Sequence, residues 1–360
     1  GTRGPDGRWQ PHMAEEWLRA TQQLGGSIAA TEFANEPNFI SLTKAPVGYT
    51  PADYQRDYAL FANWLKKSSP NTLLLAPGAA ELPHTLRLLA RYAPGRKVFY
   101  SEDLITEESP KPDGFSFHYY GGVSKRCGVP LIGTKEEDAL SETWLNRIDE
   151  AVNHTETLRS RIGSKAPIWI TETAQSACGG DPWASTSVDG FRFMDQAARL
   201  ARQGVQVYIH NTLSEGDYAL LDEHSFAPRP NYWLAYLWKQ FMGTLVLDAG
   251  AGKTGLHVYS HCLRGQPGGV AVLAINLDQA SKRELRLDHP GVLYAATQDP
   301  LSSTGLLLNG QLMQLGEGDT MPILDGKPVP DGKVMLAPAS INFIRIETAA
   351  NRSCSVRDTH

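Results

Sequence analysis

The stretch Ser27-Ile-Ala-Ala-Thr-Glu-Phe-Ala-Asn-Glu-Pro-Asn38 is a short apolar run that ends in a cluster of polar residues. Such a run is typical of a buried strand in an α/β protein. An Asn-Glu-Pro at the carboxyl end of a strand places an amide and a carboxylate at the active-site face of a parallel barrel. We therefore expect Glu36 to be catalytic, and Asn35 and Asn38 to contact a substrate.

Short apolar runs and longer amphipathic segments alternate from Gly26 to about Gln240, as expected of strand-helix units around a parallel sheet. The expected strands are Ser27–Phe33, Thr72–Pro77, Gly114–Tyr119, Ile168–Thr171 and Val205–His210. The expected helices are Ala52–Lys67, Leu82–Tyr92, Leu140–Arg161, Val188–Arg202 and Asn231–Phe241. A closed (β/α)8 barrel needs eight units, so we expect this α/β chain to supply about strands 4 to 8. The other strands would belong to an N-terminal polypeptide segment upstream of Gly1, carried by a second chain or cut from this one.

The sequence after Gly243 changes to short β-rich segments at turn-like spacing, which is typical of a β-sandwich. The clearest of these segments are Leu256–Cys262, Val270–Asn276, Glu284–Leu287 and Ile341–Ile346. The predicted domains are therefore a partial catalytic barrel over residues 1–243 and a C-terminal β-sandwich over residues 244–360.

Composition excludes several classes of function. The net charge of −5 argues against a protein that gathers nucleic acid through a global positive field. The longest apolar runs are far shorter than the roughly 18 residues of a membrane span. The ten histidines lack a metal-binding spacing such as His-Glu-x-x-His, and no phosphate loop or nucleotide fingerprint is present. We therefore predict no metal and no cofactor.

A second carboxylate follows a later strand, in Ile168-Trp-Ile-Thr-Glu-Thr-Ala174. Retaining glycoside hydrolysis needs two carboxyl groups about 5 to 5.5 Å apart, one as acid/base and one as nucleophile. We assign Glu36 to the first role and Glu172 to the second. Tyr119 is expected to donate a hydrogen bond to the nucleophile, whereas strand alternation leaves Glu32 with a structural role.

Several motifs together resemble the heparanases and related endo-β-glucuronidases. They are Asn35-Glu-Pro-Asn38, Phe117-His-Tyr-Tyr120, Glu172-Thr-Ala174, Gly179-Gly180, Gly216-Asp-Tyr-Ala-Leu-Leu-Asp-Glu223, Pro230-Asn-Tyr-Trp233, Gly243-Thr-Leu-Val246, Val258-Tyr-Ser-His-Cys262, Ala274-Ile-Asn-Leu277 and Leu308-Asn-Gly310. The resemblance implies hydrolysis of glucuronic acid linkages in heparan sulfate or a related glycosaminoglycan. It also implies a large subunit that is completed by a small N-terminal chain, and a secreted, periplasmic or lysosomal location.

The resemblance assigns further residues. It implies that the backbone of Gly179 and Gly180, with Tyr218, cradles the carboxylate of a uronic acid, and that Tyr119 contacts the nucleophile. It also implies a disulfide between Cys262 and Cys354. For the remaining two cysteines, Cys127 and Cys178, both a second bridge at the cleft rim and free thiols stay open.

The sequence departs from the animal heparanases at positions that meet sulfate groups. Acidic and apolar residues occupy the region around Pro77–Pro83. His210, a candidate substrate-binding residue, stands where the family has a glutamine. Lys125 and Arg126 could compensate as substrate-binding residues, or could be an ordinary solvated pair. The deficit favours a substrate with little sulfate near the cleavage point.

Other functions remain open from the sequence. An exo-acting β-glucuronidase or a hyaluronan-cleaving endo-β-glucuronidase would need the same two glutamates. A catalytically inactive homologue that binds glycosaminoglycan is a further alternative. Both glutamates and the acidic net charge argue against that last interpretation.

Overall fold

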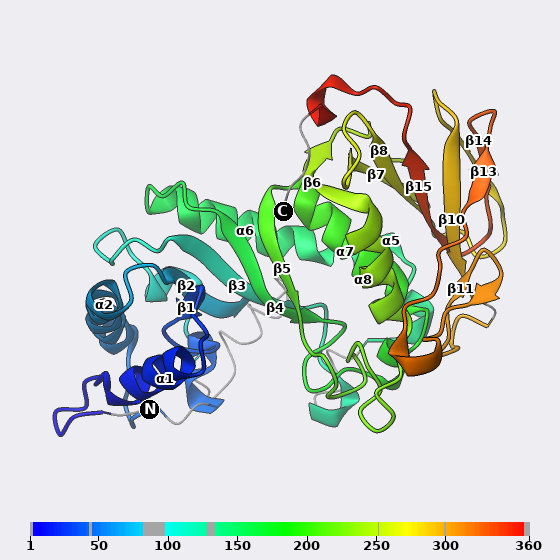
Figure 1. Ribbon diagram of the computed structural model, residues 1–360. Coiled ribbons are helices and arrows are strands. Elements are labelled where there is room, and N and C mark those ends of the chain that lie inside the picture. Colours follow the sequence, from blue (N-terminus) through cyan, green and yellow to red (C-terminus); the bar gives the residue numbers. More distant parts are fainter. Residues whose placement is uncertain are drawn as a thin grey trace. The chain divides into compact units, whose positions relative to one another are not determined.

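The apolar runs of the first part of the chain form a five-stranded parallel sheet in the order β1-β2-β3-β4-β5 (Figure 1). The computed structural model describes residues 3–42, 45–81, 98–127, 134–250, 252–298 and 300–355. The five strands are β1 (Ala30–Glu32), β2 (Leu73–Glu81), β3 (Gly114–Tyr120), β4 (Ile168–Ala174) and β5 (Val205–His210). All five predicted strands are thus confirmed, although β1 is shorter and β2 longer than predicted.

The helices are α1 (His12–Gln23), α2 (Pro51–Ser68), α4 (Ser101–Leu104), α5 (Glu142–Leu145), α6 (Arg147–Arg161), α7 (Asp189–Arg202) and α8 (Pro230–Phe241). Helix α2 begins as the sequence predicts, because Thr50 and Asp53 form a capping box around Pro51. The predicted helix Leu82–Tyr92 lies outside the described residues. A single helix over Leu140–Arg161 is wrong, since the segment divides at Asn146 into α5 and α6.

Helix α2 packs against the parallel sheet through one apolar face. Its buried residues Tyr54, Tyr58, Phe61 and Leu65 recur at intervals of three and four, which places them on one face. The Tyr54 hydroxyl donates to the carbonyl of Pro77 in β2, at 3.3 Å. Strand β3 is buried along almost its whole length, as expected when helices cover a parallel sheet.

The later part of the chain forms an antiparallel sheet in the order β12-β11-β10-β15-β8-β7-β6, with β13 paired to β10. A separate pair joins β14 to β9. The strands are β6 (Met242–Leu247), β7 (Leu256–Leu263), β8 (Val270–Asn276), β9 (Arg283–Arg286), β10 (Gly291–Thr297), β11 (Leu307–Leu308), β12 (Gln311–Leu312), β13 (Lys327–Val329), β14 (Lys333–Leu336) and β15 (Ser340–Ile346).

The two antiparallel sheets share one apolar core. Val334 and Leu336 of β14 cluster with Val272 of β8 and Ile344 of β15, all of them buried. Packing of one sheet face against another is the arrangement of a sandwich. The predicted fold class, a barrel sheet with a C-terminal β-sandwich, is therefore confirmed.

The chain divides into two compact units. The first comprises Gly1–Tyr120, Asp149–Thr173 and Gly204–Ile209, and the second comprises Gly121–Ile148, Ala174–Gln203 and His210–His360. Helix α7 belongs to the second unit, where it packs closely against α8 and β15. A Cβ on Gly190 of α7 would touch Leu234 of α8 and Ile341 of β15. The change from parallel to antiparallel sheet falls at Met242, close to the predicted domain boundary.

Two disulfides form, both in the second unit. The predicted Cys262–Cys354 bridge is confirmed, and it ties the end of β7 to the turn that follows β15. The Cys127–Cys178 bridge, which the sequence left open, joins the loops after β3 and β4. Disulfides of this kind are typical of oxidising compartments. In the described parts of the chain, every helix is too short or too polar to cross a membrane.

Candidate active site

Glu36 is positioned by a glycine bulge in β2. The N–H of Glu36 donates to the carbonyl of Gly78 at 3.0 Å. Gly78 has a φ of +65°, and a Cβ there would lie 2.8 Å from the Glu32 carboxyl carbon and 3.2 Å from the carbonyl of Ala34. Only glycine therefore allows the turn after β1 to pass so close to β2.

The backbone of Glu36 itself is in the left-handed region, with a φ of +42°. This conformation costs a non-glycine residue on the order of 1 to 3 kcal/mol and persists where surrounding structure enforces it. Here the carbonyl of Gly78 fixes the residue on one side, and the N–H of Phe39 donates to the Glu36 carbonyl at 2.9 Å on the other. Such strain is concentrated at functional sites.

Asn38 is a structural residue, so its predicted contact with substrate is wrong. Its Nδ2 donates to the carbonyl of Ala80 at 2.8 Å, and its Oδ1 accepts from the Ala80 N–H at 3.0 Å. The side chain is also buried. Both ends of the amide thus bind the backbone of β2. Asn35, in contrast, is exposed next to Glu36.

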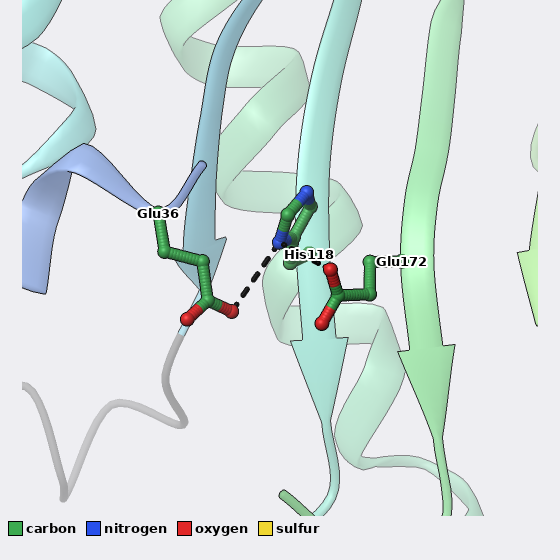
Figure 2. Close-up of side chains that lie close together, drawn as sticks. All are labelled: Glu36, His118 and Glu172. Atoms are coloured by element: carbon green, nitrogen blue, oxygen red, sulfur yellow. Dashed lines mark hydrogen bonds and ion pairs between the residues drawn. The ribbon is translucent and has the colours of Figure 1, made fainter. Parts of the chain in front are cut away.

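The two glutamates lie close together, although one follows β1 and the other is on β4. Glu172 is on β4, and His118 of β3 lies between it and Glu36 (Figure 2). The His118 Nδ1 is 3.3 Å from Glu36 Oε1 and 3.5 Å from Glu172 Oε2. One carboxylate oxygen of each glutamate and one ring nitrogen of His118 all lie within 4.8 Å of one another.

The hydroxyl that donates to Glu172 belongs to Tyr120, not to the predicted Tyr119. The Tyr120 hydroxyl is 2.6 Å from Glu172 Oε1. Successive side chains of a strand point to opposite faces, so Tyr120 shares the face of His118, and Tyr119 points to the other face. Tyr119 is buried, and its carbonyl accepts from the Thr173 hydroxyl.

His118 is a buried cation among three carboxylates. Burial by itself would lower its pKa, but hydrogen bonds to Glu32 and Glu36 and the charges of Glu32 and Glu172 raise the pKa to about 9. Its Nε2 lies 3.5 Å from Glu32 Oε2, and Glu32 Oε1 accepts from the Thr171 hydroxyl at 2.7 Å. Burial opposes charge on Glu32 as well, yet His118 holds the pKa of Glu32 below its usual value.

The same three side chains, Glu36, His118 and Glu172, could each offer a ligand atom to a metal ion. A metal would require a free lone pair on the imidazole of His118. The raised pKa leaves this ring protonated at neutral pH, with both N–H groups facing carboxylates. The chemistry of the donor set therefore favours a proton rather than a metal at this position.

Three features of the site were not predicted from the sequence. They are the position of His118 between the glutamates, the hydrogen bond of Tyr120 to Glu172, and the contact of Glu32 with His118. The sequence did contain a signal for them. His118 and Tyr120 are two residues apart at the end of one strand, so their side chains share a face. Glu32 was predicted to be structural. It accepts a hydrogen bond from the Thr171 hydroxyl of β4 and pairs with the His118 ring of β3.

In the second unit, Gly179 and Gly180 follow β4 and have φ values of +85° and +80°. Neither N–H has a hydrogen-bond acceptor within the described ranges, although Gly180 is buried. Tyr218 packs against this turn, since a Cβ on Gly180 would lie 3.0 Å from its ring. Backbone N–H groups that have no acceptor within the described ranges are candidates for binding an anion.

The other predicted substrate ligands surround this turn. Arg126 donates to the carbonyl of Gly179 at 3.2 Å and forms an ion pair with Asp217. His210 Nε2 donates to the carbonyl of Tyr218 at 2.8 Å. Burial lowers the pKa of His210 to about 3, so the ring is neutral and supports Tyr218. Lys125 is exposed, and its backbone N–H donates to Asp181.

Known proteins resemble the chain in sequence and in fold. It matches none of the profiles that describe protein families. Heparanase from Mus musculus is 28% identical to it over 98% of this chain. Baicalin-beta-D-glucuronidase from Scutellaria baicalensis is 25% identical over 83% of the chain. The chain spans 65% of the length of the first of these relatives and 56% of the second.

Among solved structures, CelM2, a bifunctional glucanase-xylanase from a metagenome library, superimposes with a TM-score of 0.61 at 14% identity. The match covers 94% of this chain and 69% of that one. At this identity the likeness shows the fold, a barrel with an antiparallel domain. Taken together, the comparisons make the chain similar in sequence to the heparanases and to a plant β-glucuronidase, and similar in fold to a glucanase-xylanase.

Proposed function

We propose that the protein is a retaining endo-β-D-glucuronidase that hydrolyses glucuronic acid linkages in heparan sulfate-type glycosaminoglycans. One observation carries this proposal, the approach of Glu36 and Glu172 oxygens to within 4.8 Å. Inverting enzymes keep their two carboxyl groups roughly 6.5 to 9.5 Å apart to hold a water between them. The shorter separation favours direct attack by a carboxylate.

In the proposed first step, Glu36 gives its proton to the glycosidic oxygen while a Glu172 oxygen attacks the anomeric carbon. The leaving sugar departs as an alcohol, and a covalent glycosyl-enzyme remains on Glu172. In the second step, Glu36 takes a proton from water, the water oxygen bonds to the anomeric carbon, and Glu172 is released. Two displacements retain the anomeric configuration.

The surrounding side chains support this division of roles. The proposed reaction requires one of the two carboxyl groups to deliver a proton and the other to attack as a carboxylate. Glu172 accepts the hydrogen bond of Tyr120, which stabilises it as the anionic nucleophile. His118 is close enough to donate to either glutamate. The imidazolium can therefore stabilise negative charge on Glu172 before the first step and on Glu36 after it.

Substrate recognition is proposed to combine several groups. The N–H groups of Gly179 and Gly180, with Tyr218, bind the carboxylate of the uronic acid, which needs no basic side chain. Asn35, exposed beside Glu36, donates to a sugar hydroxyl. Lys125 meets a further anionic group. A site with so few basic residues favours chains that carry little sulfate near the cleavage point.

We also propose that an N-terminal polypeptide completes the barrel and that the protein is secreted. The path of the parallel sheet ends at β1 on one side and β5 on the other, among the described residues. Unpaired edge strands are a liability that barrel closure removes. Intact-mass analysis of the purified protein tests the first point by revealing a copurifying small chain.

The function is tested with Glu36→Gln and Glu172→Gln on heparan sulfate, hyaluronan and 4-nitrophenyl β-D-glucuronide. General acid/base and nucleophilic groups contribute about 10² to 10⁴ in rate, so both variants should lose most of kcat. Glu156→Gln is the matched control, since this exposed glutamate lies on α6 and pairs only with Arg159 among the contacts of the described chain. Product sizing separates the endo, exo and hyaluronan-cleaving alternatives. Wild-type protein that cleaves none of the three substrates would contradict the proposal.

A further inference from the structure

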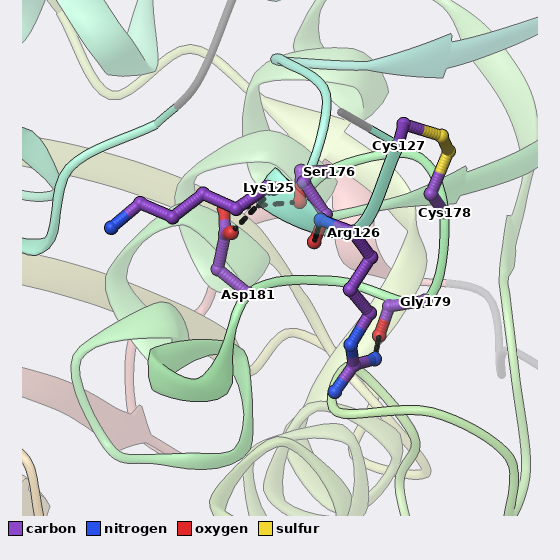
Figure 3. The surroundings of a disulfide bond; sticks show 8 residues. Lys125, Arg126, Cys127, Ser176, Cys178, Gly179 and Asp181 are labelled. Carbon is purple, nitrogen blue, oxygen red and sulfur yellow. Dashed lines mark hydrogen bonds between the residues drawn. A yellow bond between two sulfur atoms is a disulfide. The ribbon is translucent and has the colours of Figure 1, made fainter. Parts of the chain in front are cut away.

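The loops after β3 and β4 are joined at several points next to the Gly179–Gly180 turn. Val123 and Ala177 form a parallel bridge, in which the N–H of Ser124 donates to the carbonyl of Ala177 at 3.0 Å. The Cys127–Cys178 disulfide follows at once. Figure 3 shows Arg126 lying along Gly179, beside this disulfide. The two loops are thus tied by backbone, covalent and side-chain bonds.

A third segment, at Gly216 and Asp217, is bonded to the same Gly179–Gly180 turn. The N–H of Asp217 donates to the carbonyl of Gly179 at 2.8 Å, and the Asp217 carboxylate pairs with Arg126, which donates to the same carbonyl. Gly216 makes this approach possible, because a Cβ there would lie 2.9 Å from the Gly179 oxygen. The carbonyl of Gly179 therefore accepts two hydrogen bonds, one from Asp217 and one from Arg126.

The far end of the loop is anchored as well. Asp181 is buried, and its carboxylate accepts hydrogen bonds from the Thr134 hydroxyl, the Gln175 amide, the Ser176 hydroxyl and the Lys125 N–H. Its own N–H donates to Gln175 Oε1 at 2.9 Å. The two glycines are thus held between a disulfide at Cys178 and a buried anchor at Asp181.

Peptide geometry gives this arrangement a directional effect. In a trans peptide, the C=O of one residue and the N–H of the next point in opposite directions. Fixing the carbonyl of Gly179 toward Arg126 and Asp217 therefore fixes the N–H of Gly180 on the opposite side. Two adjacent glycines would otherwise have more backbone freedom than any other pair, and ordering them would reduce binding.

We propose that Arg126, Asp217 and the Cys127–Cys178 disulfide are positioning groups that aim the Gly180 N–H at the carboxylate of the uronic acid. Arg126 acts through Gly179 and not as a direct ligand, since Asp217 already neutralises its charge. The three groups then determine selectivity for carboxylated over uncharged sugars. This inference rests on the proposed function, and it adds the residues that prepare the carboxylate site.

The experiment compares Arg126→Met, Asp217→Asn and the double variant Cys127→Ser/Cys178→Ser with wild type. Each should raise KM for 4-nitrophenyl β-D-glucuronide about tenfold, the effect of roughly 1.4 kcal/mol of binding, and change kcat less than twofold. Arg126→Lys should give an intermediate KM, because an ammonium supplies donors without the planar fork that reaches both partners. Binding of D-glucuronate to Glu172→Gln should weaken in parallel when the same changes are added, whereas binding of D-glucose should not change.

Cys262→Ser/Cys354→Ser is the matched control, since it removes the other disulfide and should lower Tm without raising KM. If the Cys127→Ser/Cys178→Ser protein does not fold, Arg126→Lys and Asp217→Asn still decide the question. Unchanged KM and unchanged glucuronate binding in these variants overturn the positioning role while the proposed function stands. Wild-type protein that neither cleaves the glucuronide nor binds glucuronate overturns both.

Discussion

At the scale of single residues, the site depends on the positive charge of His118. Three carboxylates, those of Glu32, Glu36 and Glu172, lie within 3.5 Å of its two ring nitrogens. Without a cation, their mutual repulsion in a largely buried setting would oppose folding. The imidazolium therefore contributes to stability as well as to the charge balance of the proposed reaction.

The pKa of His118 gives this contribution a pH window. The pKa rises from 6.5 to about 9 on folding, so the stabilisation is fully present below pH 6.5 and is lost as the pH rises through 9. A shift of this size corresponds to about 3 kcal/mol. We expect the free energy of unfolding of wild type to exceed that of His118→Gln by about 3 kcal/mol more at pH 6 than at pH 9.5. Urea denaturation at both values measures it.

His257 supplies the control for this measurement. It is also buried, which opposes its protonation, but hydrogen bonds and charges from Asp195 and Glu142 raise its pKa. His257→Gln should therefore change the pH dependence of stability in the same direction, yet leave kcat unaffected, because this residue lies on β7 and its partners, Asp195 and Glu142, are not groups of the proposed site. Equal pH profiles for wild type and His118→Gln would refute the role given to His118.

The two neighbouring tyrosines allow a matched comparison. Tyr120→Phe removes the hydrogen bond to Glu172, and a bond to a charged group is worth about 1.5 to 3 kcal/mol. We expect kcat to fall roughly tenfold to hundredfold. Tyr119→Phe, one residue away on the opposite face, should change kcat much less. Steady-state kinetics on an aryl glucuronide decides, and the reverse ranking would restore the original assignment to Tyr119.

Both glutamates were predictable from the sequence, because each follows an apolar run and the two motifs together fit one reaction. The choice between Tyr119 and Tyr120 was not, since the face of a strand depends on register, and register is set by neighbouring strands. Asn38 was misassigned for a similar reason. Its motif resembles a binding site, but its amide is satisfied by the backbone of a strand that lies far away in the sequence.

At the scale of elements, the bulge of β2 determines where Glu36 lies. Gly78→Ala would add the cost of a left-handed alanine to a clash with Glu32, roughly 2 to 5 kcal/mol in total. We expect lower stability and a kcat/KM reduced at least tenfold, because the carbonyl of Gly78 would no longer hold Glu36. Thermal unfolding and kinetics measure the two effects.

Gly163→Ala is the control that separates the cost of a left-handed alanine from the displacement of Glu36. Gly163 follows α6 with a φ of +66°, nearly that of Gly78, and an added Cβ would meet no described atom within 4 Å. It should therefore lose only about 1 kcal/mol of stability and no activity. A Gly78→Ala enzyme as active as Gly163→Ala would show that the bulge does not position the acid/base.

Elements with a strong periodic pattern were predictable, among them β5, α2 and the sandwich strands β7 and β8. The failures have local causes. Ser141 accepts a hydrogen bond from the N–H of Trp144 and starts the short helix α5, which ends before Asn146, where the predicted single helix divides. Helix α1 was not among the predicted helices, and it buries no residue.

At the scale of the whole molecule, the Cys262–Cys354 bridge closes a loop of 92 residues in the unfolded chain. The chain-entropy model gives about 4 to 5 kcal/mol for such a loop. Cys262→Ser/Cys354→Ser should lose up to this amount, seen as a lower Tm, and keep its activity at 25 °C. A fully stable double variant would mean that the sandwich holds its last strand without covalent help.

The acidic charge of the chain bears on how it meets its substrate. A net charge of −5 gives no long-range attraction for a polyanion, so recognition of a uronic acid has to be local. The Gly179–Gly180 turn provides free N–H groups and no net charge, and a binding site of this kind fits an acidic protein. The salt dependence of KM is accordingly expected to be shallow.

The central claim is that Glu172 forms a covalent bond to the sugar. A 2-deoxy-2-fluoro-β-D-glucuronyl fluoride should inactivate the enzyme. The 2-fluorine slows both formation and hydrolysis of the glycosyl-enzyme, whereas the anomeric fluoride is a good leaving group and speeds formation, so the covalent intermediate accumulates. Peptide mapping by mass spectrometry is then expected to find one fluoroglucuronyl group on the peptide that contains Glu172, and none in Glu172→Gln. Label on another carboxylate, or turnover with inverted configuration and no label, would contradict the account.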